Sequence, residues 1–177
     1  MNLVDRIDAL LPQTQCTRCG YAACRPYASA IAGGAPINRC PPGGAAGIHA
    51  LSRLLGRPER PLDPDCGQEM PPRTAVIDPD ACIGCARCLP ACPVDAIVGA
   101  QHFLHAVLEN DCNGCELCIA TCPVDCIAMV ARRPDRPAPH ADDNRRRFEQ
   151  HRARREREFG ERERLLAERK RAARPAT

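Results

Sequence analysis

Eight cysteines of this chain follow a single spacing that occurs twice, thirty residues apart. Residues 82–93 and residues 112–123 both read C-x2-C-x2-C-x3-C-P. Runs of this kind supply thiolate ligands to [4Fe-4S] clusters, and where two runs occur, the fourth cysteine of each binds the cluster of the other run. The spacing predicts one cluster on Cys82, Cys85, Cys88 and Cys122, and a second on Cys112, Cys115, Cys118 and Cys92. Such a chain is expected to move electrons one at a time.

Two other uses of paired cysteines fit this spacing less well. Zinc also binds C-x2-C pairs, but four cysteines within eleven residues, followed by proline and then duplicated, suit it poorly. A disulfide framework is disfavoured because cytosolic thiols stay reduced. The chain also has no basic start followed by an apolar segment, so a cytoplasmic location is expected.

Four further cysteines lie upstream with a different spacing, C-x2-C-x4-C-x15-C. They are Cys16, Cys19, Cys24 and Cys40. Four thiolates suit either a third [4Fe-4S] cluster or a tetrahedral zinc ion. The apolar periodicity predicts a helix that begins at Cys24 and ends at Gly33-Gly34. The spacing of Leu3, Ile7 and Leu11 predicts another short helix, which we expect to pack on this cysteine site.

The upstream motif carries a specific family resemblance. The run LPQTQCTRCGYAACRPYA…INRCPPGG resembles the Fe–S domain of the B subunit of Rnf-type (also called Rsx) electron transport complexes. In that family a two-cluster ferredoxin module follows, and the resemblance covers about residues 1–131. It implies a third [4Fe-4S] cluster on the four upstream cysteines. It also implies electron relay between soluble ferredoxin or NADH-linked partners and a membrane-embedded, ion-moving complex.

The sequence departs from this family at its start. Family members typically begin with a transmembrane helix, whereas here fifteen residues precede Cys16. We therefore expect either a soluble relative or a peripheral subunit held by redox partners on the cytoplasmic face of the inner membrane.

The expected fold is α+β, in four parts. A small helical 4Fe-4S domain occupies residues 1–56, a proline-rich linker residues 57–73, a bacterial two-[4Fe-4S] ferredoxin domain residues 74–131, and an Arg/Glu-rich tail residues 132–177. Short antiparallel strands are expected within residues 96–109. Four apolar residues at matched repeat positions should shield the clusters from solvent: Val94, Ile97, Val124 and Ile127.

Charge is divided unequally along the chain. Residues 1–131 hold 9 Arg/Lys and 13 Asp/Glu, a net of −4, whereas residues 132–177 hold 16 and 9, a net of +7. An acidic cluster-bearing part suits a basic redox partner. The tail is expected to be a solvated helix or disordered, and it could contact a partner or anionic lipid headgroups. Nucleic-acid binding is disfavoured because aromatic residues make up only 3% of the chain.

The remaining candidate residues carry weaker signals. Cys66 lies in a turn-like linker, where a thirteenth ligand is possible but an incidental cysteine is expected. Cys126 aligns with Ala96 of the first repeat and should be a small packed residue. Asp95 and its repeat counterpart should bond local backbone in turns, and His105 is expected in a strand or on the surface.

The chain has no G-x-G-x-x-G motif after a strand, so we expect an electron carrier and not a self-contained enzyme. The leading hypothesis is a three-cluster relay like the Rnf B subunit. The alternatives are a soluble polyferredoxin that donates electrons to another cytosolic enzyme, and a nucleic-acid-associated protein with structural clusters.

Overall fold

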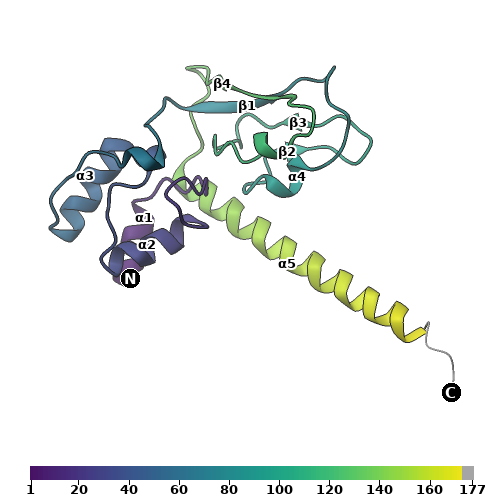
Figure 1. The fold of residues 1–177 in the computed structure, drawn as a ribbon, viewed down its shortest axis with the longest axis horizontal. Helices are drawn as coiled ribbons and strands as arrows, with labels where there is room; N and C mark the ends of the chain where they lie inside the picture. The colour runs from purple at the N-terminus through teal and green to yellow at the C-terminus, as the bar shows by residue number, and fades with distance from the viewer. Residues whose placement is uncertain (173–177) are drawn as a thin grey trace.

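A computed structural model describes residues 1–172, which form two small cysteine-rich units and a long C-terminal helix (Figure 1). The first unit is helical, in agreement with the expected fold class. Its elements are α1 (Leu3–Ala9), α2 (Cys24–Ala32), η1 (Pro41–Gly43), α3 (Gly44–Leu55) and η2 (Pro64–Cys66). The predicted start of α2 at Cys24 and its end at Gly33 are both confirmed.

The core of the first unit forms between its helices. Ile7 of α1 and Ile31 of α2 are fully buried, and Leu51 of α3 joins the same apolar cluster. The expected packing of the N-terminal helix on the cysteine site is therefore confirmed. A capping box at Asn2 and Asp5 satisfies the first backbone N–H groups of α1 and fixes its start.

The second unit, which we call the ferredoxin-like unit (residues 73–131), contains short strands and single helical turns. Its elements are β1 (Arg73–Ile77), α4 (Cys88–Ala91), β2 (Ile97–Val98), β3 (Ala106–Val107), η3 (Ile119–Thr121) and β4 (Ile127–Ala131). β2 pairs with β3 in the predicted antiparallel arrangement. β1 pairs with β4 from Arg73↔Ala131 to Ile77↔Ile127, so the first and last strands close the unit.

The backbone of the ferredoxin-like unit repeats with the thirty-residue period of the sequence. Three residue pairs with positive φ mark the matched turns: Gly84 and Gly114, Ala86 and Glu116, Asp95 and Asp125. Val94, Ile97 and Ile127 are buried, and Val124 is 39% exposed. All four line the thiol-lined cavities of this unit, so their predicted place beside the cysteine sets is confirmed.

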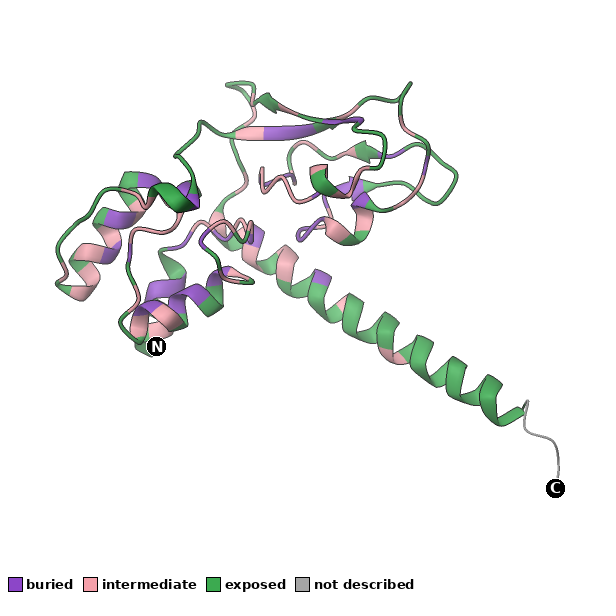
Figure 2. Ribbon diagram, viewed as in Figure 1, coloured by how far each residue is buried: buried purple, intermediate pink, exposed green. Residues whose placement is uncertain are grey.

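The C-terminal helix α5 (Ala141–Ala172) begins against the two units and then extends away from them (Figure 1). Its buried residues, Asn144 and His151, lie in its first three turns, and the following turns are almost wholly exposed (Figure 2). The tail expected from residue 132 is therefore helical over Ala141–Ala172. Residues 173–177 lie outside the described part of the chain. Within residues 1–172 no helix is both long and apolar enough to cross a membrane.

Candidate iron–sulfur cluster sites

The four upstream cysteines converge in the first unit. Burial is the main cause that raises the pKa of the Cys24 thiol to about 12, with smaller contributions from the neighbouring Cys16 and Cys19. Burial also raises the pKa of Cys40, whose neighbours are the thiols of Cys16, Cys19 and Cys24. The structure thus brings together the set that the sequence singled out, although its role as a ligand set stays a prediction.

A chain of buried amide side chains fixes the loop that carries this set. Gln13 donates to the Asp8 backbone oxygen at 2.7 Å, and Gln15 donates to the Gln13 side-chain oxygen at 2.9 Å. Gln15 then accepts from the Cys24 backbone N–H at 2.8 Å. Ala23, the residue before α2, offers no capping side chain, so Gln15 supplies the cap from nine residues upstream.

Tyr27 and the segment after α3 hold the fourth cysteine. The Tyr27 hydroxyl donates to the Pro36 oxygen at 2.9 Å and accepts from the Arg39 N–H at 3.0 Å, directly before Cys40. The segment after α3 folds back on this loop, and the Asp63 N–H donates to the Asn38 oxygen at 2.8 Å.

Cys66 belongs to this returning segment, at the end of the turn Pro64–Cys66. It is buried, and it lies beside the Arg39 side chain, whose pKa it raises. The sequence gives no sign that the segment with Cys66 packs back on the first unit, and the expectation that Cys66 is no ligand stays a prediction. Cys66 also lies near Cys19, whose pKa it helps to raise after the larger effect of burial.

The ferredoxin-like unit holds two thiol-lined cavities. The first, which we call cavity A, is lined by Cys82, Cys85, Cys88 and Cys122, together with His105 and Cys126. Burial raises the pKa of Cys88, and the charges of Cys85, Cys82 and Cys122 add to the shift. Cavity A thus combines the first three cysteines of one run with the fourth cysteine of the other.

The second cavity, cavity B, is lined by Cys92, Cys112, Cys115 and Cys118. Burial raises the pKa values of Cys115 and Cys118 to about 12. Backbone N–H groups point at two of the sulfurs: Ala96 donates to Cys92 Sγ at 3.2 Å and Ala75 to Cys112 Sγ at 3.5 Å. Cavities A and B are therefore related by the crossed arrangement of the two cysteine runs.

The donor chemistry of both cavities fits a [4Fe-4S] cluster. Each presents four thiols, the ligands that such clusters take, and cavity B directs N–H groups at sulfur atoms that carry negative charge in the bound state. Gly84 and Gly114 keep the cysteine loops close to neighbouring backbone. A Cβ at Gly84 would lie 2.9 Å from the Phe103 N, and one at Gly114 would lie 2.7 Å from the Arg73 oxygen.

His105 and Asp95 were predicted incorrectly. His105 is 4% exposed and its Nδ1 lies 3.6 Å from Cys82 Sγ, so it belongs to cavity A and not to the surface. Asp95 accepts from Arg154 at 2.5 Å and lies 2.8 Å from His151 Nδ1, both on α5, instead of serving only its own turn. The contact of His105 with Cys82 and those of Asp95 with α5 join residues far apart in the sequence, so no local sequence pattern indicates them.

Asn113 and Glu116 join the two units, a role that the sequence did not indicate. Asn113 Nδ2 donates to the Thr14 oxygen at 3.1 Å, and Glu116 pairs with Arg18 at 2.5 Å. Both residues line cavity B, while Thr14 and Arg18 flank Cys16. The cavity B loop therefore contacts the loop that opens the upstream cysteine set.

Comparison with known families assigns both cysteine-rich regions. Residues 75–129 match the family described as "4Fe-4S dicluster domain", and residues 11–42 match the family described as "Putative Fe-S cluster". The two matches include all twelve cysteines of the three sets.

Similar proteins carry one name, that of the B subunit of the ion-translocating oxidoreductase complex. The protein of this name from Azoarcus sp. (strain BH72) is 60% identical over 108 residues, which cover 60% of this chain and 59% of that protein. Those from Pseudomonas paraeruginosa and Shewanella amazonensis are 55% identical over 108 residues and 54% identical over 109. This chain spans 56% and 57% of their lengths. Over the matched region, the chain is similar to the B subunit of the ion-translocating oxidoreductase complex.

Proposed function

We propose that this chain is an electron-transfer protein that binds three [4Fe-4S] clusters and serves as a relay subunit of an ion-translocating oxidoreductase complex. Cys16, Cys19, Cys24 and Cys40 would hold one cluster, and the thiols of cavities A and B the other two. Each cluster, when bound, accepts and releases one electron.

The contact between the cavity B loop and the first cysteine loop carries this proposal. Arg18 lies two residues after Cys16, and its partner Glu116 is adjacent to Cys115. The ion pair and the Asn113–Thr14 hydrogen bond join the loop of cavity B to the loop that opens the upstream cysteine set. A relay needs its sites close together, and this contact supports that arrangement.

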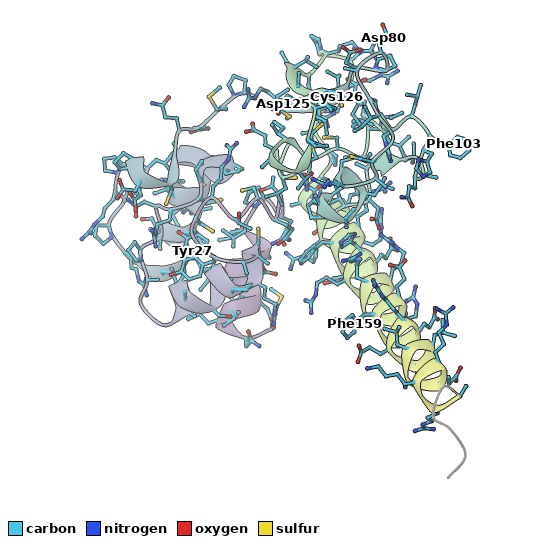
Figure 3. All side chains as sticks on the ribbon, turned by 45° about the vertical axis from the view of Figure 1, so that its right-hand side comes forward. Tyr27, Asp80, Phe103, Asp125, Cys126 and Phe159 are labelled. Atoms are coloured by element: carbon cyan, nitrogen blue, oxygen red, sulfur yellow. The ribbon has the colours of Figure 1, made fainter. Side chains whose placement is uncertain are left out.

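The residues around the cavities protect the sites and leave one approach open. Buried Val94 and Ile97 exclude water beside cavity B, and a dry, hydrogen-bonded surrounding sets the potential of a bound cluster. At cavity A, the neighbouring Ile83 is exposed, and Phe103 projects from the rim of the unit (Figure 3). A redox partner could therefore approach cavity A, while the first unit covers the cavity B loop.

The test is the metal content of the protein purified without oxygen. We expect about 12 iron and about 12 sulfide per chain, with little zinc. Cys24→Ala, Cys88→Ala and Cys118→Ala should each remove about four iron atoms, because each breaks one ligand set. Cys66→Ala is the matched control: it removes a buried thiol outside the three sets and should leave the count unchanged. About 8 iron with one zinc would contradict a third cluster.

A second experiment tests the membrane partner. If the chain is a peripheral subunit on the cytoplasmic face of the inner membrane, it should sediment with membranes that contain the complex and be released by salt. An entirely soluble pool would instead indicate a polyferredoxin that serves a cytosolic enzyme.

A further inference from the structure

Cavities A and B share one backbone plan, but at two buried positions cavity A has a side chain that can donate a hydrogen bond where cavity B has alanine. With the thirty-residue period, Ala75 and Ala96 of cavity B correspond to His105 and Cys126 of cavity A. All four residues are buried. Cavity B therefore has two methyl groups where cavity A has an imidazole and a thiol, which can both donate hydrogen bonds.

Both additional groups of cavity A contact sulfur atoms of the ligand set. His105 Nδ1 lies 3.6 Å from Cys82 Sγ, and Cys126 Sγ lies 3.4 Å from Cys122 Sγ. The ligand cysteines are thiolates when a cluster is bound, so they can only accept. Cys126 must then be the donor of its pair, and a proton on His105 Nδ1 makes the imidazole a donor as well.

The surrounding residues indicate that the imidazole is built into this position. A Cβ at Gly99 would lie 2.5 Å from His105 Cδ2, so only glycine leaves room for the ring there. The counterpart of Gly99 is Met129, which faces Ala75 in the β1–β4 pairing. Cavity A thus has a large residue, His105, beside a small one, Gly99, whereas cavity B has a small residue, Ala75, beside a large one, Met129. This exchange places a polar side chain at cavity A.

His105 Nε2 is buried and has no hydrogen-bond partner among the described residues. If the proton were on Nε2, a buried N–H would be unpaired and a lone pair would face the Cys82 thiolate. A proton on Nδ1 avoids both costs. This tautomer directs an N–H bond at the ligand sulfur.

We propose that His105 and Cys126 act as positioning donors that raise the reduction potential of the cavity A cluster above that of the cavity B cluster. Hydrogen bonds to the sulfurs stabilise the reduced cluster, which carries one more negative charge. The electron shared by the ferredoxin-like unit then rests at cavity A, on the side of exposed Ile83 and Phe103. This inference rests on the proposed relay function, because it requires reducible clusters.

The test is an EPR-monitored redox titration of the full chain, with iron content measured on each sample. The wild type should show two different potentials for the ferredoxin-like clusters. His105→Ala should lower the higher of the two reduction potentials by about 59 mV, which corresponds to a tenfold change in the equilibrium constant for one electron. His105→Gln keeps an N–H donor and should lower this potential less. Cys126→Ala, which removes a donor, should also lower it, whereas Cys126→Ser, which keeps a hydroxyl donor, should not.

The double variant His105→Ala/Cys126→Ala removes both additional donors from cavity A, and the difference between its two potentials should shrink. His102→Ala, at an exposed histidine three residues away, is the control and should change neither potential. Equal potentials in the wild type, or equal shifts for the donor-keeping and donor-removing variants, would overturn the inference and leave the relay intact. Clusters that cannot be reduced at all would instead contradict the relay.

Discussion

Burial makes several of the proposed ligand cysteines hard to ionise before metal binds. Burial raises the pKa values of Cys24, Cys115 and Cys118 from 9.0 to about 12. A cluster binds thiolates, so loading must release these protons. Cluster loading should therefore weaken as the pH falls and strengthen as the pH rises.

We therefore predict that apoprotein supplied with limiting iron and sulfide gains more cluster at about pH 8.5 than at about pH 6.5. Visible absorbance and iron content measure the occupancy. The apoprotein itself should lose stability as the pH rises from 9.0 towards 12, because unfolding then releases the protons that the buried thiols retain. Equal occupancy across the pH series would contradict the account.

Gly84 is one of two glycines at which a cysteine loop lies too close to neighbouring backbone to accept a side chain. Its φ is +67°, and an added Cβ would meet the Phe103 backbone at 2.9 Å. Gly84→Ala should cost about 1–3 kcal/mol from the backbone conformation alone and lower the iron content. Gly47→Ala, in α3 with nothing within 4 Å, should instead gain up to about 1 kcal/mol. Thermal unfolding of the loaded proteins measures the stability change of each variant. If Gly84→Ala and Gly47→Ala change the stability alike, the close backbone approach at Gly84 is unimportant.

The twelve cysteines and their grouping into sets could be predicted from the sequence because cluster ligation imposes a strict local spacing. His105 could not be recognised as part of cavity A, since it follows Cys82 by 23 residues and belongs to no ligand motif. Cys126 was correctly predicted to be a packed residue, but its approach to Cys122 depends on how the turn after Pro123 folds.

At the scale of elements, α2 and the β2–β3 pair could be predicted, whereas the β1–β4 pair and the docking of α5 were not. The apolar period of α2 and the short alternation of β2 and β3 are local signals. α5 carries no apolar stripe, and its charged residues resemble those of a solvated helix. Its attachment depends on pairs such as Arg145–Asp8 and Arg147–Asp111, which join positions far apart in the chain.

Arg145 is the residue through which α5 should hold the first unit. It pairs with the Asp8 carboxylate, which is almost fully buried, and donates to the Asp8 backbone oxygen at 3.0 Å. Arg145→Ala leaves that carboxylate short of a partner and should cost about 1.5–3 kcal/mol. Limited proteolysis should then cut within α5 at its start.

Arg162→Ala is the matched control, because it removes the same charge from the exposed end of α5. It should change neither the unfolding midpoint nor the cleavage pattern. If both variants behave like the wild type, α5 is not anchored by the Arg145–Asp8 pair.

At the scale of the whole molecule, two small cores and three cysteine sets are joined by few contacts. The first unit and the ferredoxin-like unit each bury their own apolar cluster. The Arg18–Glu116 pair, the Asn113–Thr14 bond and the start of α5 connect them. Units this small depend on bound metal for much of their stability, so loading of the clusters and the relative position of the units should be coupled.

The central claim is that this chain carries electrons on three clusters, and the number of electrons it accepts tests that claim most directly. Anaerobically purified protein would be reduced stepwise while EPR signals and iron content are recorded. The account predicts about three electrons per chain, one for each four-cysteine set. Uptake of about two electrons, with zinc bound at Cys16, Cys19, Cys24 and Cys40, would contradict it.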